Sequence, residues 1–431
     1  MGKIRILVIS YLPWRDDTSV GNTLSNLFNG LQEKIEFASI FFKGGNPCNR
    51  ITSRNFYISE IELAKSIITR KKVGKSVNKE ANCGTVKKTS GGIYNKAREV
   101  RWESMLLAQD LIGLLSEWRS EELYQFIEEF QPDLVFGPLG RVPVANLLMQ
   151  HIHEKYNIPL VTYAWDDHYS LRKWSLSPFF WLKTFLERKY IKKCVEQCEF
   201  LYTITTSMKE EYEKYFHKTC RILYKSYYFD TTPSLKEEVG KPIDIIYMGN
   251  IGAGRWQVLA DVASVLKKIN ADKVRSQLKI FTMSPISKKI HAALDIPGTS
   301  KLMKPVPNGE VLSTMESADI LLHVEPTSEK ERLFYRLSFS TKIVDYFYTA
   351  RCILAVGGDT AAMKYIKDND AGIVIEQTDS LYTELNKLID DPERIITYGR
   401  KGWDCGVRNH ERSMIQSQMY NDLYEVVGSK K

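Results

Sequence analysis

The feature that most constrains the fold is an alternation of short apolar runs with helical patterns, which starts twice along the chain. The first series opens at residues 4–11 (IRILVISY), a run of strand length, which a polar loop with Gly21 and a helical pattern over 22–31 follow. The pattern restarts at residues 243–248, after a turn-rich segment over 227–241. Apolar strands separated by helices are typical of parallel sheets covered on both faces. Further strands are expected at residues 37–42, 132–137, 158–164, 200–205, 278–282, 320–324, 352–356 and 372–375.

Two such series predict two α/β domains, each with a Rossmann-like fold, over residues 1–228 and 241–402. The length of 431 residues agrees with two domains, because single hydrophobic cores rarely grow so large. Two open parallel sheets leave a crevice at the carboxyl ends of their strands, and we expect the ligand site there.

The net charge of +8 comes from one segment. Residues 65–101 contain eleven Lys or Arg against two acidic residues, so the rest of the chain is nearly neutral. Residues 46–101 show no periodicity and residues 65–101 are poor in apolar side chains, which predicts a long mobile insertion whose basic part is 65–101. Tyr94 is the only aromatic residue of the basic segment, whereas nucleic-acid sites interleave aromatic and basic side chains. We therefore expect no nucleic-acid partner.

The chain has no apolar run of 18 residues and no signal-peptide pattern at its start. Its seven cysteines include no CxxC pair, which favours reduced thiols and argues against a zinc site. We expect a cytoplasmic protein without a bound metal.

The first candidate site is Gly249–Arg255 (GNIGAGR), between a strand and a helix. Backbone N–H groups of Gly249 and Asn250, the helix start and Arg255 could contact a phosphate. The glycine spacing is not that of a dinucleotide fingerprint, so NAD is not expected. A flexible strand-to-helix turn remains the alternative.

The second candidate is residues 338–347 (SFSTKIVDYF). The hydroxyls of Ser340 and Thr341 and the ammonium of Lys342 suit a diphosphate, and Asp345 could accept hydrogen bonds from ribose hydroxyls. The alternative is an ordinary capped helix with surface side chains.

The third candidate is Asp166-Asp167-His168, at the end of a strand. Carboxylates there could bind sugar hydroxyls or take a proton from an acceptor, and a hydrogen-bonded turn is the alternative. The fourth is residues 169–193, where basic and aromatic residues interleave, with Trp174 and Trp181 among them. This composition suits peripheral contact with an anionic membrane, although aromatic helices are more often buried in a core.

Several of these segments together resemble the retaining GT-B glycosyltransferases of the family-four type, which include bacterial polysaccharide and capsule enzymes. The resemblance rests on Ser340 with Lys342, on Asp345-Tyr346, and on the apolar strand that ends at Gly357-Gly358. It extends to residues 311–326 (VLSTMESADILLHVEP), 207–212 (SMKEEY) and the loop at Gly21-Asn22.

The resemblance implies a nucleotide-sugar donor as substrate, no cofactor, and an acceptor-side N-terminal domain. Arg255 and Lys342 would neutralise the leaving diphosphate, Asp345 would hold the ribose, and Gly21 would let its loop approach the donor phosphate. Residues 403–431 would form a crossover helix that packs on the N-terminal domain, through an apolar stripe of Met414, Met419, Leu423, Tyr424 and Val427.

The chain departs from the family pattern at Leu337, where an acid is usual, and at Ala260-Asp261, where a lysine is common. The expected function is sugar transfer to a glycan or lipid-linked acceptor in bacterial surface polysaccharide biosynthesis. A GT-B sugar-nucleotide epimerase and a non-catalytic partner subunit remain as alternatives.

Overall fold

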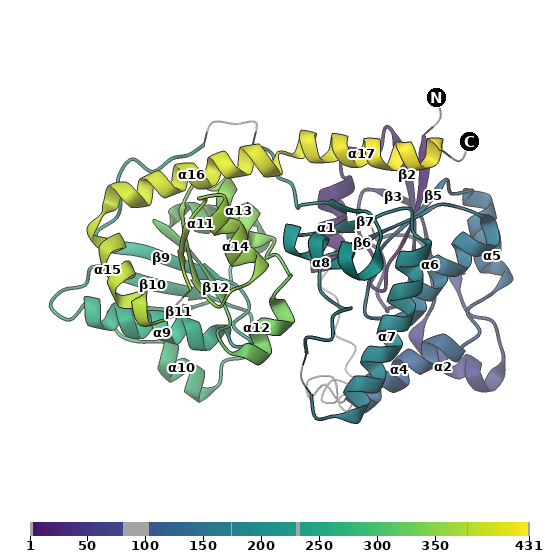
Figure 1. Cartoon of the computed structure of the whole chain (residues 1–431), viewed down its shortest axis with the longest axis horizontal. Coiled ribbons are helices and arrows are strands. Elements are labelled where there is room, and N and C mark those ends of the chain that lie inside the picture. Colours follow the sequence, from purple (N-terminus) through teal and green to yellow (C-terminus); the bar gives the residue numbers. More distant parts are fainter. Residues whose placement is uncertain (1–2, 81–102, 174, 230–232, 377, 430–431) are drawn as a thin grey trace. The chain divides into compact units, whose positions relative to one another are not determined.

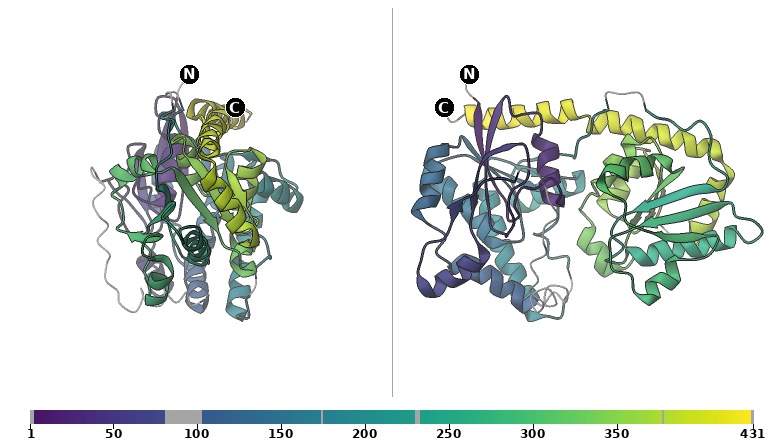
Figure 2. Two further views of the ribbon diagram at one scale, coloured as in Figure 1. Left: turned by 90° about the vertical axis from the view of Figure 1, so that its left-hand side faces the viewer. Right: turned by 180° about the vertical axis from the view of Figure 1, so that it is seen from behind.

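The computed structural model of the chain describes residues 3–80, 103–173, 175–229, 233–376 and 378–429 (Figure 1). The chain divides into two compact units. Unit 1 contains Met1–Tyr224 together with Gln416–Lys431, and unit 2 contains Lys225–Ile415. Each unit has one sheet with helices on both of its sides (Figures 1 and 2). The predicted pair of Rossmann-like units is confirmed.

The sheet of unit 1 has the strand order β4-β3-β2-β1-β5-β6-β7-β8, and only the pairing of β3 with β4 is antiparallel among the described strands. The strands are β1 (Ile4–Ile9), β2 (Ile35–Phe41), β3 (Thr52–Tyr57), β4 (Lys75–Ser76), β5 (Leu134–Pro138), β6 (Leu160–Ala164), β7 (Leu201–Thr203) and β8 (Cys220–Ile222). The helices are α1 (Ser19–Phe28), α2 (Glu60–Thr69), α4 (Glu103–Leu115), α5 (Glu121–Phe130), α6 (Pro143–Tyr156), α7 (Pro178–Gln197) and α8 (Thr206–Phe216).

The sheet of unit 2 is parallel, in the order β11-β10-β9-β12-β13-β14. Its strands are β9 (Ile243–Met248), β10 (Ser276–Phe281), β11 (Ser300–Met303), β12 (Ile320–Glu325), β13 (Cys352–Gly357) and β14 (Ile373–Ile375). Its helices are α9 (Arg255–Ile269), α10 (Lys288–Leu294), α11 (Val311–Ser317), α12 (Glu329–Tyr335), α13 (Lys342–Tyr348), α14 (Ala361–Asp368), α15 (Leu381–Asp390) and α16 (Pro392–His410), with short 3₁₀ turns at Asn308–Glu310 and Thr378–Ser380. The last helix, α17 (Arg412–Gly428), begins in unit 2 and continues in unit 1.

The central strands read as continuous apolar runs because both faces of each sheet are covered. Every residue of β12 and of β13 is buried. A parallel sheet buried on both sides cannot show the polar alternation of a half-exposed strand. In contrast, β10 alternates buried and half-buried residues along its length.

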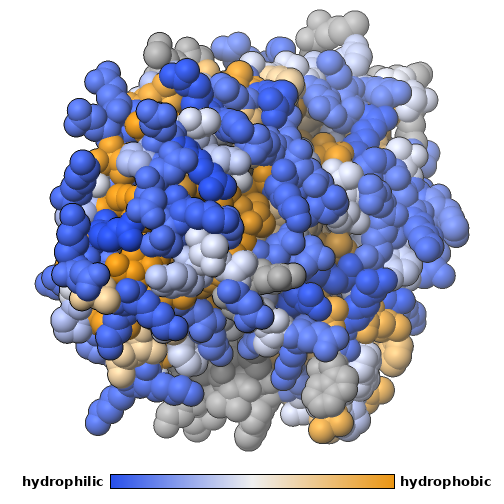
Figure 3. Space-filling model, turned by 60° about the vertical axis from the view of Figure 1, so that its left-hand side comes forward, coloured by the Kyte–Doolittle hydropathy of each residue, from blue (hydrophilic) through white to orange (hydrophobic). Residues whose placement is uncertain are grey.

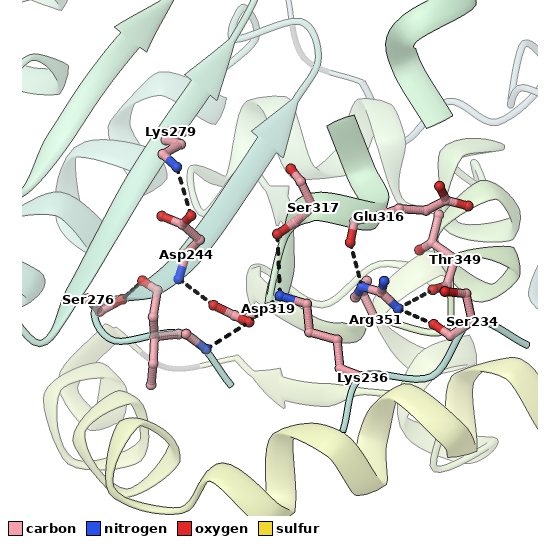
Figure 4. A network of polar contacts seen from close by, with 12 residues as sticks. Ser234, Lys236, Asp244, Ser276, Lys279, Glu316, Ser317, Asp319, Thr349 and Arg351 are labelled. Atoms are coloured by element: carbon pink, nitrogen blue, oxygen red, sulfur yellow. Dashed lines mark hydrogen bonds and ion pairs between the residues drawn. The ribbon is translucent and has the colours of Figure 1, made fainter. Parts of the chain in front are cut away.

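A polar network fixes the start of unit 2 to the amino-terminal edge of its sheet (Figure 4). The buried carboxylate of Asp319, which precedes β12, accepts hydrogen bonds from the backbone N–H groups of Gly240 (3.2 Å) and Asp244 (2.8 Å) and pairs with Lys236. Arg351, which precedes β13, donates to the carbonyl of Ser234 at 2.6 Å. Asp319, in the segment 311–326 noted in the sequence, therefore anchors the connecting segment at the edge opposite the carboxyl ends of the strands.

The observed structure differs from the expectations in three respects: the extent of the insertion, the boundary at 402 and the buried stripe of α17. Residues 52–76 form β3, α2 and β4, so much of the expected mobile insertion is regular structure, and its remaining part at 81–102 lies outside the described residues. The boundary expected at 402 lies inside α16, which runs to His410 in unit 2. On α17 the buried stripe is Ile415, Met419, Leu423, Val426 and Val427, whereas Met414 and Tyr424 are largely exposed.

The part of α17 in unit 1 is held by polar contacts as well as by its apolar stripe. Gln416 donates its amide N–H groups to the carbonyls of Leu27 (3.0 Å) and Asn29 (2.8 Å), at the end of α1. Asp422 accepts from Tyr202 at 2.7 Å and pairs with Arg221 at 2.6 Å. These partners come from three separate elements of the unit, so α17 ties together segments that are far apart in the sequence.

Among the described residues, five cysteines are free and buried, which agrees with the expected thiols, but Cys48 is disulfide-bonded and departs from that expectation. Among the described helices, none is both long and apolar enough to cross a membrane. The face drawn in Figure 3 is mainly hydrophilic, with hydrophobic residues in separate areas between the charged ones.

Candidate functional site

The candidate site of unit 2 lies at the carboxyl ends of β9 and β12, where the strand order reverses. From β9 the chain continues to β10 on one side, and β12 pairs with β9 on the other side. The loops that follow the two strands therefore diverge, and open α/β sheets bind their ligands at such a point. The predicted glycine segment follows β9 here and leads into α9.

Gly249 and Lys342 meet at this edge although they are far apart in the sequence. The Lys342 ammonium donates to the carbonyl oxygen of Met248 at 3.0 Å. A Cβ atom on Gly249 would lie 2.6 Å from the Lys342 Nζ atom, so the glycine leaves the space that the ammonium needs. Burial lowers the pKa of Lys342, and the nearby Arg255 lowers it further. Two cations that repel each other in a partly buried position are well suited to bind an anion.

Arg255 is the first residue of α9 and is held from two sides. Its guanidinium lies 3.6 Å from the buried carboxylate of Glu325, at the end of β12, and 4.5 Å from the centre of the Tyr335 ring. Glu325 is in turn 3.1 Å from the imidazole of His323. The sequence reading missed Glu325 and Tyr335, because a single acid or tyrosine carries no spacing signal; only the position of Glu325 at a strand end hints at a role.

Two backbone N–H groups at the start of α9 are already engaged within the loop: those of Arg255 and Trp256 donate to the carbonyls of Gly252 (3.3 Å) and Ile251 (2.9 Å). The N-cap residue of α9 is Gly254, at φ 82°, and among the described residues no side chain caps the helix. The backbone N–H groups of a helix start carry partial positive charge, so α9, Arg255 and Lys342 add to one another. Asn250 has a different function: its side-chain oxygen accepts from the Gly252 N–H at 2.6 Å and from the Ser284 hydroxyl at 3.2 Å, which shapes the loop.

The second predicted segment enters the same region with α13. Ser340 and Thr341 immediately precede this helix and are half-buried. Asp345 pairs with Lys225 at 2.5 Å, and both side chains are mostly shielded from solvent. A ribose would therefore have to share the Asp345 carboxylate with Lys225. Leu337, which replaces the usual acid of the resembled family, is buried.

Gly357 closes the carboxyl edge of β13 beside this site. Its φ is 139°, and a Cβ atom there would lie 2.0 Å from the carbonyl oxygen of Glu325. Only glycine allows the ends of β12 and β13 to approach so closely. The Gly-Gly pair noted in the sequence thus maintains the position of Glu325.

The third predicted segment follows β6 in unit 1. The buried Asp167 carboxylate accepts from the backbone of Tyr169 (3.2 Å) and Ser170 (3.0 Å), from the Ser170 hydroxyl and from the Tyr212 hydroxyl (3.1 Å). These partners assign Asp167 to a turn, the alternative that the sequence allowed. Asp166 is exposed and His168 is half-buried, so these two side chains remain candidates for contact with an acceptor.

Gly21 has a local structural reason for being glycine. It lies inside the first turn of α1, and its N–H donates to the Thr18 hydroxyl oxygen at 3.2 Å. A Cβ atom would lie 2.0 Å from the backbone carbonyl oxygen of Arg15. The backbone of Arg15 therefore already approaches Gly21 closely, where the resemblance places a donor phosphate.

Residues 169–193 divide into a buried and an exposed set. Tyr169 is buried, Lys183 is buried and paired with Glu187, and the Trp181 indole N–H donates to the Ser175 carbonyl at 2.8 Å. The position of Trp174 lies outside the described residues. The large exposed apolar side chains are Leu171, Leu176, Phe179, Leu182 and Phe185.

The chain is similar to several solved proteins in its structure. No protein-family model matches the chain, and no curated protein matches it. HepE from Anabaena, solved in complex with UDP, has a TM-score of 0.62 and 12% identity, over 98% of this chain and 100% of that chain. The UDP-forming trehalose-phosphate synthase of Burkholderia vietnamiensis has a TM-score of 0.59 and 9% identity, over 98% of this chain and 100% of that chain.

A third similar structure is WaaG, a glycosyltransferase involved in lipopolysaccharide biosynthesis. Its TM-score is 0.55 at 12% identity, over 96% of this chain and 98% of that chain. The likeness covers nearly the full length of all three proteins, so it includes both units and their order along the chain. The chain therefore has the GT-B fold, with two Rossmann-like units.

Proposed function

We propose that the protein is a glycosyltransferase that moves a sugar from a nucleotide-sugar to a glycan or lipid-linked acceptor, with retention, in bacterial surface polysaccharide biosynthesis. The observation that carries this proposal is the convergence of Arg255, Lys342 and the positive end of α9 at the switch point of unit 2. HepE, with the same fold, is solved with UDP and with UDP-glucose, and WaaG is a glycosyltransferase of lipopolysaccharide biosynthesis.

The chemistry of the proposed reaction depends on the departing diphosphate. As the bond between sugar and phosphate breaks, negative charge grows on the phosphate oxygens, and fixed cations stabilise that charge more than they stabilise the donor. Arg255 is preorganised for this task by Glu325 and Tyr335, and Lys342 by Gly249. No protein nucleophile is needed in this scheme, and the proposed retention rests on the family resemblance.

The acceptor side of the reaction is assigned to unit 1. Burial lowers the pKa of His168 well below its usual value, so its imidazole is neutral at pH 7. A neutral imidazole can accept a hydrogen bond from an acceptor hydroxyl, and the exposed Asp166 can bind one. No metal is required by this scheme, and no cluster of three or more His, Cys, Asp or Glu suited to a metal occurs among the described residues.

A donor screen tests the proposal. Calorimetry against the sugar nucleotides of UDP, GDP, ADP and CMP should give binding to at least one of them, and Arg255→Gln should abolish or strongly weaken it. Incubation with the donor alone separates the alternatives: an epimerase would form a new nucleotide-sugar, whereas a transferase would show slow hydrolysis at most. Absence of binding to every donor would favour a non-catalytic partner subunit.

We also propose peripheral contact with an anionic membrane, through a surface that we call the α7 apolar face. It consists of Leu176, Phe179, Leu182 and Phe185, which recur at every third residue and are 85%, 47%, 57% and 55% exposed. Phe179, Leu182 and Phe185 lie on α7, which also carries exposed lysines, and Leu176 just precedes it; exposed apolar and basic side chains together are typical of an interfacial helix.

Liposome co-sedimentation tests the membrane proposal. The wild type should sediment with vesicles that contain an anionic phospholipid, and Phe179→Ser with Leu182→Ser should reduce the sedimenting fraction at low and at high salt. The matched control is Ile61→Ser with Ile68→Ser on α2, where the exposed apolar residues stand outside this face. Equal sedimentation of the two double variants would contradict the assignment of this face.

A further inference from the structure

Basic side chains gather at the carboxyl edge of the unit-1 sheet, where its strand order also reverses. β1 pairs with β2 on one side and with β5 on the other, so the loops after β1 and β5 diverge. Arg141 lies in the loop between β5 and α6. His168 and Lys173 follow β6, which pairs with β5. Neither Arg141 nor Lys173 is needed for the donor chemistry of unit 2.

Part of this cluster is neutralised within the protein. The buried Lys183 pairs with Glu187 and lies 3.8 Å from the Asp110 carboxylate. Burial raises the pKa of Asp110 to about 7, so this carboxyl carries only part of a charge at neutral pH. Arg141 Nε lies 3.7 Å from the Glu187 carboxylate, beyond hydrogen-bonding distance, and 37% of the Arg141 side chain is exposed. Glu187 thus helps to orient the guanidinium, which is partly exposed to solvent.

The pKa shifts of Lys173 and His168 indicate the electrostatic environment of this edge. The Lys173 ammonium donates to the Asp167 carbonyl at 3.0 Å, and burial lowers its pKa. The nearby Asp167 and Glu187 carboxylates raise this pKa, whereas Arg141 and Lys183 lower it. The charged groups that lower the pKa of His168, after burial, are Arg141, Lys173 and Lys183. These three cations act on the imidazole in the same direction, and a bound anion would offset their charge.

The adjoining helix start adds to this potential. Helix α6 begins at Pro143, with Val142 as its N-cap, and among the described residues no side chain caps it. The buried Asn146 donates to the Gly140 carbonyl at 2.9 Å, which fixes the loop that carries Arg141. A Cβ atom on Gly140 would have no neighbour nearer than 3.8 Å, so there is space beside this loop. A fixed loop, a helix start and a cation are the elements of a phosphate site.

We propose that the acceptor carries a phosphate, which Arg141 and Lys173 bind at the carboxyl edge of the unit-1 sheet, beside His168. The proposal rests on the proposed glycosyl transfer, since it names the class of acceptor for that reaction. The phosphate holds the acceptor so that one of its hydroxyls lies near the neutral imidazole. Two sources share this chemistry: a water-soluble sugar phosphate and a lipid-linked phosphate.

Binding of phosphate probes tests the site in the full chain. The histidine ring signals are followed by NMR at constant ionic strength, with His168→Gln to identify the His168 signal. Inorganic phosphate should move that signal in a saturable manner, and Arg141→Gln and Lys173→Gln should each weaken binding about tenfold, as expected for the loss of one charge-assisted contact. Arg172→Gln is the matched control, because its exposed side chain neighbours Lys173 in the chain.

Two organic probes distinguish the sources. Glucose 6-phosphate binding more tightly than inorganic phosphate supports a sugar phosphate, and farnesyl phosphate doing so supports a lipid-linked phosphate. A His168 signal that phosphate leaves unchanged, or equal binding by Arg141→Gln and Arg172→Gln, would overturn the proposal. Donor binding is measured on the same samples. If the wild type binds phosphate but no nucleotide-sugar donor, the glycosyltransferase function is rejected and the anion site stands. If it binds a donor but no phosphate, only this site is rejected.

Discussion

Replacement of Lys342 by Met is expected to separate binding from stability. The Lys342 ammonium is half-buried, lies beside Arg255, and has a lowered pKa because of both. Methionine keeps most of the side-chain volume and removes the charge. Loss of one hydrogen bond to a charged group amounts to about 1.5–3 kcal/mol, so the affinity for the nucleoside diphosphate should fall about 10- to 150-fold.

The same change should leave the protein at least as stable as the wild type at pH 7. A lysine whose folded-state pKa is lowered disfavours the folded state wherever the group is protonated, and this penalty is lost as the pH rises from the folded-state pKa to the higher unfolded-state pKa. Met248 would lose one hydrogen bond to its carbonyl oxygen, which opposes the gain. The melting temperature of Lys342→Met should therefore be equal to or above that of the wild type.

The pH dependence of donor binding provides an independent measurement. In the wild type the affinity should fall as the pH rises through the lowered pKa of Lys342, because only the ammonium attracts the diphosphate. This dependence should be absent from Lys342→Met. Gly249→Ala is the companion variant: its Cβ would displace the ammonium rather than remove it, so the affinity should fall by less than in Lys342→Met.

Calorimetry with UDP and with UDP-glucose, at several pH values, measures these effects. Lys367→Met is the matched control, because Lys367 is an exposed lysine of the same unit that pairs with Glu376. If Lys342→Met binds the donor as tightly as Lys367→Met at every pH, the diphosphate does not bind at this edge of the sheet, and the reasoning from Arg255 and Lys342 is refuted.

Three further predictions follow from the same structure. Glu325→Gln should lower kcat about 10- to 100-fold with little change in melting temperature, because Arg255 loses its orienting carboxylate, and steady-state kinetics with a fold check by circular dichroism measures this. Asp167→Ala should lower the free energy of unfolding by at least about 2 kcal/mol in denaturant titrations, because four hydrogen bonds of a buried carboxylate are lost, whereas Asp166→Ala should affect activity alone. Burial lowers the pKa of His410 to about 4, so unfolding should become easier by up to about 3 kcal/mol as the pH falls from 6.5 to 4, and His410→Gln should weaken this acid sensitivity in melting curves.

The sequence located most regular elements because their signals are local. An apolar run such as 243–248 must be a covered strand, and the glycines that follow it must form a turn, whatever the rest of the chain does. The sequence also brought Arg255, Lys342 and Asp345 into one hypothesis through the order of the segments. It did not anticipate β3 and α2, since short elements in a basic segment lack a strong periodicity.

The candidate site needed tertiary structure wherever a role depends on a partner distant in the chain. The sequence marked Asp166 and Asp167 alike, but only the fold buries Asp167 against Tyr212 and leaves Asp166 exposed. It gave no sign that Glu325 orients Arg255, or that Lys225 pairs with Asp345.

The sequence by itself determined that the chain forms two parallel-sheet units with a glycine-rich turn after the first strand of the second, because hydrophobic periodicity and turn chemistry act over a few residues. Only the tertiary structure decided which charges meet. Arg141, Lys173 and His168 come from loops after two different strands, and they form one positive region because parallel strands bring their carboxyl ends to the same edge of a sheet.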